Sequence, residues 1–270
     1  MNDLNRSNVI VEQSLNSIGR GELADYLAHA YCHEGSCSFT FNHKEFTMVA
    51  GDCMITRRSD LVSNIRPSET FCVEVIYVTP EFIQLSAPRS NYGTKGGIML
   101  FENPIMHLTP EQQSRCVLDF ENIKRRLVQT EHRFHRDTMM NAVQCMIIDF
   151  YDFHAQLFSE ESVTSKYALI MNGFIALLER GDYLRNREIG YYADKLCITT
   201  KYLSEVSKKI SGHPANYWIV RYTTLEILNQ LRDKHKTLKE LSEYFHFPST
   251  SYFNRYVQKY LHAAPGDLRK

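Results

Sequence analysis

The last third of the chain holds a diverged internal repeat, and this feature restricts the fold more than any other. Three positions recur at an offset of 49 residues: Ala193 with Ser242, Leu196 with Phe245, and Ile198 with Phe247. Three more recur at an offset of 50 residues: Leu203 with Phe253, Val206 with Tyr256, and Gly212 with His262. The second copy therefore has one extra residue in its turn, and we expect each copy to form one supersecondary unit.

The first copy predicts a short helix, a tight turn and a second helix. The short helix covers residues 187–196, and the turn contains Cys197 and Ile198. Thr199 and Thr200 carry hydroxyls that can cap the next helix, which runs to about Ile210. The spacing of this helix buries Leu203, Val206 and Ile210 and leaves outward-facing Lys201, Ser204, Glu205 and Lys208.

The second copy repeats this plan. A short helix over residues 238–245 precedes the turn 246–248, and Ser249 caps the second helix. The apolar spacing predicts that Phe253, Tyr256 and Tyr260 are buried. The residues predicted to project outward are Thr250, Ser251, Asn254, Arg255 and Gln258.

Residues 215–233 connect the two copies, with Trp218, Tyr222, Leu225 and Leu228 at helical spacing. A rigid helix here would hold both copies on one face of a DNA duplex, where adjacent major-groove openings lie about 34 Å apart. An exposed second helix after a tight turn is the layout of a helix-turn-helix DNA-binding motif. A helical packing module without a role in DNA binding is the alternative.

The outward-facing side chains have the chemistry of DNA contacts. Arg255 can bind guanine, and Asn254 or Gln258 can bind adenine. Lys208 and Lys209 can bind phosphates. The predicted DNA-binding residues are Thr200, Lys201, Ser204, Glu205, Lys208, Lys209, Ser249, Thr250, Ser251, Asn254, Arg255 and Gln258.

The formal charge of the whole chain is zero, but it is unevenly distributed. Residues 165–270 contain 17 Lys and Arg against 10 Asp and Glu, which leaves 14 basic and 21 acidic residues in residues 1–164. A basic last third favours a polyanion, such as double-stranded DNA, as its partner. Glu205 fits such a surface only as an acceptor for a cytosine amine, because a carboxylate repels phosphate.

Several short segments of the repeat carry a more specific signal: ADKL at 193–196, TTKYLS at 199–204, KKISG at 208–212, Arg221, SYFNR at 251–255 and APGDLR at 264–269. At these residues the chain resembles the AraC/XylS family of transcription regulators, over roughly its last hundred residues. The resemblance implies that the leading domain is a cupin-like barrel that binds a small effector or dimerises, often through a helical hairpin. A double repeat with these spacings is a far stronger signal than a single motif.

The chain departs from the family pattern at four positions. The family usually has glycine at the turn of the second motif, where this chain has His246, and the first turn carries Cys197. Histidine tolerates a left-handed backbone better than most residues, and cysteine does so less readily. Ser207 replaces a customary core phenylalanine, and His262 replaces a customary glycine.

The first part of the chain, from about residue 27 to residue 78, predicts short strands. Segments 38–41, 46–49, 52–56 and 71–78 are rich in aromatic and β-branched residues, and turn residues separate them. A small antiparallel β-barrel or sandwich is expected.

After Pro104 the apolar period becomes helical. Thr109, Pro110 and Glu111 form a helix start, followed by apolar residues three or four positions apart: Cys116, Phe120, Ile123 and Leu127. A second run over residues 136–158 places on one stripe Val143, Met146, Ile147, Phe150, His154 and Leu157. Two such stripes suit either a core or a homodimer interface through the 109–158 helices.

The predicted fold class is α+β, with an N-terminal cupin-like antiparallel β-barrel that carries a helical hairpin and a C-terminal all-α double helix-turn-helix domain. Residues 1–158 form the effector-binding or dimerisation domain, residues 159–165 a polar linker, and residues 166–270 the DNA-binding domain.

Little in the sequence favours an enzyme. Metal-dependent cupins usually use an H-x-H pair with a carboxylate, whereas His29, His33 and His43 are scattered. His132 and His135 lie between the predicted helices and are expected at the surface. Nucleophile-elbow, Walker and dinucleotide motifs are absent from the sequence. We therefore predict no catalytic residue, no metal and no cofactor.

The seven cysteines are scattered and form no C-x-x-C pair. The sequence has no stretch of about 18 apolar residues, and residues 1–20 are polar. These features predict a reduced, cytoplasmic chain with structural thiols and no membrane partner.

The sequence as a whole predicts a transcription regulator that binds DNA through two helix-turn-helix motifs and responds to a small-molecule effector. Two alternatives stay open: a cupin-type enzyme or sensor with a helical interaction module, and a DNA-binding protein without an effector. The sequence names neither the effector nor the operator, and it does not distinguish an activator from a repressor.

Overall fold

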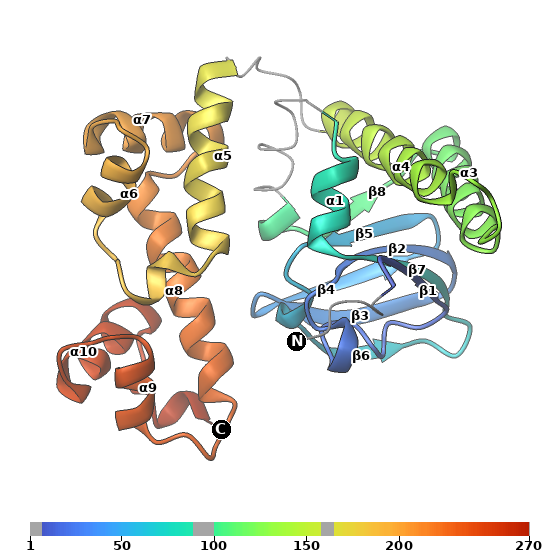
Figure 1. Cartoon of the computed structure of the whole chain (residues 1–270). Helices are drawn as coiled ribbons and strands as arrows, with labels where there is room; N and C mark the ends of the chain where they lie inside the picture. The colour runs from blue at the N-terminus through green and yellow to red at the C-terminus, as the bar shows by residue number, and fades with distance from the viewer. Residues whose placement is uncertain (1–6, 89–99, 158–164, 270) are drawn as a thin grey trace. The chain divides into compact units, whose positions relative to one another are not determined.

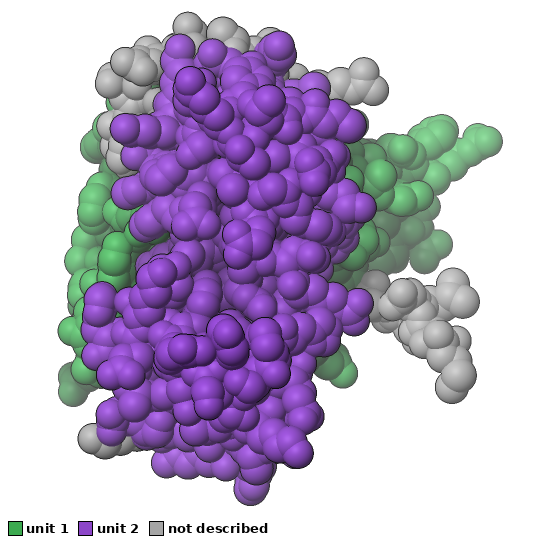
Figure 2. All heavy atoms as spheres, turned by 90° about the vertical axis from the view of Figure 1, so that its left-hand side faces the viewer, with its two compact units in different colours: residues 1–162 green, residues 163–270 purple. Residues whose placement is uncertain are grey.

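The computed structural model describes residues 7–88, 100–157 and 165–269. The chain divides into two compact units, residues 1–162 and residues 163–270, which Figure 2 shows in separate colours. Of the predicted linker, residues 159–165, only Ser165 falls within the described ranges.

The N-terminal unit contains two antiparallel sheets, as the cupin-like fold class predicts. The larger sheet has the strand order β1 (Val9–Glu12), β7 (Cys72–Val78), β2 (Leu27–Glu34), β5 (Asp52–Thr56) and β8 (Ile105–His107). The smaller sheet has the order β4 (Lys44–Val49), β3 (Ser36–Phe41) and β6 (Val62–Pro67).

Strand β3 shows how the sequence produces these sheets. Its side chains alternate, so that Cys37, Phe39 and Phe41 are buried while the residues between them are partly exposed. The two-residue turn to β4 places Asn42 and His43 at φ values of 52° and 63°. These left-handed conformations suit the right-handed twist of a hairpin, and the turn lies where the sequence predicts it.

The described residues of the N-terminal unit also include the helices α1 (Pro80–Ser86), α3 (Pro110–Leu127) and α4 (His135–Leu157) and the short helices η1 (Gly21–Leu23) and η2 (Ser59–Leu61). Figure 1 shows α3 and α4 side by side, as an antiparallel pair next to the larger sheet. Tyr31, Ile55 and Ile76 of the sheet share a core with Phe120 of α3 and Phe150 of α4. The apolar stripes of both helices therefore belong mainly to this core.

The start of α3 follows the predicted signals. The Thr109 side chain accepts a hydrogen bond from the backbone N–H of Gln112, and the Gln112 side chain accepts one from the backbone N–H of Thr109. Pro110 occupies the first position, where a missing N–H costs nothing. The predicted helix start is confirmed.

The C-terminal unit is helical throughout its described residues. It contains α5 (Ser165–Glu179), η3 (Asp182–Leu184), α6 (Ile189–Lys195), α7 (Thr200–Ser211), α8 (Ala215–Leu231), α9 (Leu238–Tyr244), α10 (Thr250–Leu261) and η4 (Asp267–Arg269). Trp218, Tyr222 and Leu225 of α8 are buried as predicted, whereas Leu228 is only partly buried. Within the described ranges, every helix is too short or too polar to span a lipid bilayer.

Candidate DNA-binding interface

The first helix-turn-helix motif consists of α6, the turn at Cys197 and α7. Cys197 has a φ of 53°, in the left-handed region. The backbone N–H of Ile198 donates across the turn to the carbonyl of Ala193, at 3.0 Å. Thr199 then caps α7 by accepting a hydrogen bond from the backbone N–H of Tyr202, at 3.2 Å.

The second motif repeats this geometry in α9, the turn at His246 and α10. His246 has a φ of 51°, and the backbone N–H of Phe247 donates to the carbonyl of Ser242, at 2.9 Å. Ser249 caps α10 by accepting a hydrogen bond from the backbone N–H of Tyr252, at 3.4 Å. Equivalent atoms are 49 residues apart before the caps and 50 residues apart from the caps onward, which confirms the predicted repeat.

The two second helices, α7 and α10, are the recognition helices of the motifs. Figure 1 shows both on the same side of α8. In α7, Leu203, Val206 and Ile210 are buried, as the apolar spacing predicts. Of the predicted contacts on this helix, Ser204 is partly exposed, and the exposed residues are Thr200, Lys201, Glu205, Lys208 and Lys209.

The buried face of α10 differs from the prediction. Phe253 is buried, but Tyr256 and Tyr260 are only partly buried, and Val257 takes the fully buried position. This face matches α7, in which Ser207 is also fully buried at the equivalent position. Tyr256 still packs against the core that contains Phe253 and Val257, but it is covered less completely than Val257.

The outward face of α10 also needs a correction. Ser249, Ser251, Arg255 and Gln258 are exposed, and Thr250 is partly exposed. Asn254, however, is partly buried, and its Oδ1 atom is enclosed without a hydrogen-bond partner. The Asn254 side chain therefore does not project freely into solvent, which differs from the prediction made from the sequence.

Tyr252 belongs to this surface and was missed. It is 54% exposed in the first turn of α10, and the guanidinium carbon of Arg255 lies 4.3 Å from the centre of its ring. The two residues are three positions apart and therefore share one side of the helix. The sequence analysis did not include Tyr252 among the outward-facing residues.

Helix α5 places one cation, Lys166, and one aromatic ring, Tyr167, beside α7. The Lys166 ammonium lies 5.5 Å from the ring centre of Tyr202, and the Lys209 ammonium lies 5.1 Å from that of Tyr167. Both lysines are exposed. Basic residues of α5 and α7 thus lie on neighbouring surfaces.

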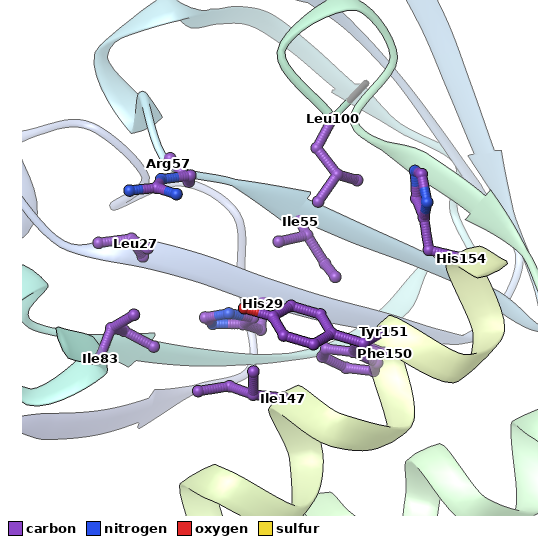
Figure 3. Close-up of a pocket in the computed structure, with 10 residues that line it drawn as sticks. All are labelled: Leu27, His29, Ile55, Arg57, Ile83, Leu100, Ile147, Phe150, Tyr151 and His154. Carbon is purple, nitrogen blue, oxygen red and sulfur yellow. The ribbon is translucent and has the colours of Figure 1, made fainter. Parts of the chain in front are cut away.

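The N-terminal unit contains a separate candidate site, a pocket of about 80 Å³ between the larger sheet and α4 (Figure 3). It is lined by Leu27, His29, Ile55, Arg57, Ile83, Leu100, Ile147, Phe150, Tyr151 and His154. Apolar walls with a few polar side chains are typical of small-molecule sites.

The surroundings of His29 and Tyr151 in this pocket shift the pKa values of both side chains. Burial lowers the pKa of His29 to about 4, and the hydrogen bond to the Ile76 carbonyl, at 3.4 Å, only partly offsets this. The imidazole is therefore neutral at pH 7, and it stacks on Phe150. Burial raises the pKa of Tyr151, while the charge of Arg57 acts in the opposite direction. Figure 3 shows the Tyr151 hydroxyl pointing toward His29.

Within residues 7–88, 100–157 and 165–269, we find no group of three or more His, Cys, Asp or Glu side chains that could hold a metal ion. His132 is exposed and His135 is partly exposed, in line with their expected place at the surface.

Comparison with known proteins gives one family match. Residues 192–270 match the family model described as a helix-turn-helix domain. A search of curated protein sequences found no match.

Two solved structures illustrate the structural similarity. ToxT from Vibrio cholerae, with an unsaturated fatty acid bound, is 13% identical over 99% of this chain and 96% of its own chain, with a TM-score of 0.45. The AraC-like transcriptional activator CuxR is 12% identical over 81% of this chain and 76% of its own, with a TM-score of 0.40. At this level of similarity, neither structure defines the fold or the function of the chain.

The family match covers the part of the chain that contains α7 to α10, both capped turns and the repeated motif segments. Residues 192–270 therefore match a helix-turn-helix domain, and the motif segments within this range are the ones that resemble the AraC/XylS family.

Proposed function

We propose that the chain is a sequence-specific transcription regulator that acts in the cytoplasm, binds double-stranded DNA through its two recognition helices and is controlled by a small-molecule effector. One observation carries this proposal: two capped turns of the same geometry present two exposed helices on one side of α8. In this proposal the chain regulates transcription by binding DNA and does not act as an enzyme.

In this proposal, α7 and α10 enter adjacent openings of the major groove, about 34 Å apart. Lys208 and Lys209 neutralise phosphates, and these contacts give most of the affinity. Base selection depends on the exposed or partly exposed side chains in the first turns of α7 and α10. In α10 it also depends on two polar residues that follow the first turn, Arg255 and Gln258. Arg255 presents two donors to guanine and Gln258 a donor and an acceptor to adenine.

The proposal is tested first by selecting preferred duplexes from a random library with the full chain. We then expect Arg255→Ala to lose about 1 to 3 kcal/mol of binding free energy on the selected duplex and little on random DNA. Lys208→Ala is the matched control, because loss of a phosphate contact weakens both complexes equally. Equal losses for Arg255→Ala on both duplexes would show that Arg255 contacts only the backbone, and no selected sequence at all would refute the proposal.

The pocket between the sheet and α4 is the proposed effector site. A small, mainly apolar ligand with one polar end fits its walls, with the polar end toward Arg57 and Tyr151. A thermal-shift screen of the full chain would find such ligands, because a ligand that binds only the folded state raises the melting temperature. Ile147→Trp should fill the pocket and abolish the shift, whereas Leu85→Trp, at an exposed position of α1, should leave it unchanged.

We also propose that the chain forms a homodimer through the helices of residues 109–158. Three apolar or weakly polar side chains of α3 and α4 face solvent: Leu118 at 68% exposure, Ile148 at 47%, and Cys145. The inner stripes of both helices are already buried in the core, so these outer residues are the ones available for a partner.

A further inference from the structure

Arg187 lies directly before the first helix-turn-helix motif, and its guanidinium contacts both η3, which precedes that motif, and the turn of the second motif. Its Nη1 atom donates to the carbonyl of Phe245, at 2.7 Å, and to the carbonyl of Leu184, at 2.8 Å. Its Nη2 atom is 3.4 Å from the carbonyl of His246. The same group lies over the ring of Phe247, 4.0 Å from its centre.

The acceptors are the last carbonyl of η3 on one side and the first two carbonyls after α9 on the other. Leu184 ends η3, which leads into the first motif, while Phe245 and His246 follow α9 in the second motif. Carbonyls at a helix end have no partner within the helix and carry partial negative charge. A cation with several donors satisfies both ends at once, so the guanidinium joins them.

The surrounding residues hold the Arg187 side chain in place. The side chain is partly buried, and burial lowers the pKa of its guanidinium, which remains charged at neutral pH. Leu184 packs against the core of the second motif beside Phe253 and Val257. Phe247 packs against the same core and is held by the ring contact with Arg187.

Two connections therefore join the motifs: the covalent rod of α8 and the contacts of Arg187. The contacts of Arg187 add a connection beyond the packing of each motif on α8, and they restrict changes in the angle between the motifs. Because the recognition helices follow directly after the turns, a small rotation of one motif displaces its helix along the DNA.

We propose that Arg187 is a positioning residue that sets the separation of the two recognition helices and so makes the protein selective for the spacing between its two base blocks. This inference rests on the proposed DNA-binding function. Inserting one base pair between the blocks moves them by about 3.4 Å and rotates them by roughly 34°. A fixed pair of helices cannot follow that change, and a loosely joined pair can.

The experiment measures affinities of the full chain for three duplexes: the selected duplex and versions with one base pair added or removed between the blocks. We expect the wild type to bind the two altered duplexes at least about tenfold more weakly, which corresponds to the loss of one base contact. Arg187→Met keeps an apolar stem over Phe247 but removes every donor. It should reduce this spacing penalty to about twofold, while binding the selected duplex somewhat more weakly.

Two further variants separate positioning from charge and from folding. Arg185→Met removes an equal charge from an exposed neighbour and should keep the wild-type penalty. Arg187→Lys keeps the charge but cannot bridge both helix ends with one ammonium, so its penalty should lie between the wild type and Arg187→Met. It also serves if Arg187→Met fails to fold, which circular dichroism would show.

The outcomes distinguish the two levels of the proposal. An unchanged spacing penalty in folded Arg187→Met or Arg187→Lys would overturn the role of Arg187, even if affinity falls uniformly. If the wild type itself selects no duplex, the proposed function fails instead.

Discussion

At the scale of single residues, the two turns of the repeat place a residue other than glycine in the left-handed backbone conformation. Cys197 and His246 both adopt left-handed φ values, near 53° and 51°. This conformation costs a residue with a Cβ atom roughly 1 to 2 kcal/mol, and glycine avoids the cost. His246 recovers part of it, because its ring nitrogen lies 2.8 Å from the Glu243 carbonyl.

We expect Cys197→Gly to stabilise the chain by about 0.5 to 1 kcal/mol, after the entropy that glycine loses on folding is subtracted. Urea unfolding followed by circular dichroism measures the change. Cys197→Ala is the control and should give no gain, since alanine has the same clash as cysteine. A gain with alanine would assign the effect to the thiol rather than to the backbone.

Asp119 provides a second prediction for a single residue. It is 8% exposed in α3, and its pKa rises to about 7, first through burial and then through the charge of Asp149, while Arg115 acts in the opposite direction. Arg115 also binds Asp149 and Asp152 of α4. The folded chain therefore holds a proton on Asp119 that the unfolded chain releases near pH 4.

Because the folded state binds more protons here, the free energy of unfolding should fall as the pH rises from about 4 to about 7. Asp119→Asn should remove this fall, so the variant gains about 4 kcal/mol over wild type across the interval. His29, with its lowered pKa, acts in the opposite direction between about pH 4 and pH 6.5. The measurement is thus the difference between wild type and variant in urea unfolding, and a constant difference at all pH values would contradict it.

The residues of the site show what local patterns can and cannot give. The caps Thr199 and Ser249 were predictable because capping depends on one hydroxyl and the N–H groups next to it. The partial burial of Asn254 and the exposure of Tyr252 were not, because both depend on how α10 is rotated against α8 and α9. Tyr256 and Val257 both face the core, and the apolar pattern alone does not determine which of the two is fully buried.

At the scale of whole elements, the long helices, the strands β3, β4, β5 and β7 and the two short helices of the repeat, α6 and α9, followed from sequence, whereas β2, β6 and the short elements at the edges of the N-terminal unit did not. Helices α3, α4, α7, α8 and α10 carry several turns of apolar spacing, and α3, α7 and α10 also have a capping hydroxyl at their start. Strands β1 and β8 have four and three residues, and α1 has seven. Such segments depend on partners far away in the chain, as β8 does on β5, so their own sequence contains little signal.

The α3–α4 pair gives the prediction that belongs to this scale. If its outer face forms the homodimer, Leu118→Glu should shift the chain to a monomer, because a carboxylate would be buried at the interface without a partner. Analytical ultracentrifugation at micromolar concentration measures the shift. Leu169→Glu alters an equally exposed leucine of α5 and should leave the dimer intact. A monomeric wild type, or dissociation by both variants, would reject this interface.

At the scale of the whole molecule, charge is separated between the two parts of the chain. Residues 165–270 contain an excess of seven basic residues, and residues 1–164 an equal excess of acidic residues. The logarithm of DNA affinity should therefore fall linearly with the logarithm of salt concentration, by about 0.9 for each phosphate neutralised.

Replacing both Lys208 and Lys209 by glutamine should reduce the magnitude of that slope by about 2, one phosphate contact for each lysine. Fluorescence anisotropy over a range of salt concentrations gives the slope. Lys234→Gln removes an exposed charge from the loop after α8 and should leave the slope unchanged. A slope that changes equally for every lysine would indicate a general field effect instead of contacts.

The two motifs have the same backbone geometry but differ in their exposed side chains. Their turns and caps have the same geometry, but α7 presents Lys201 and Glu205 where α10 presents Ser251 and Arg255. A complex of one chain with a duplex would therefore have a head and a tail. Reversing the orientation of the DNA site relative to a gene would then reverse the orientation of the bound protein. A single bound chain could therefore distinguish the two directions along the DNA as well as mark a position on it.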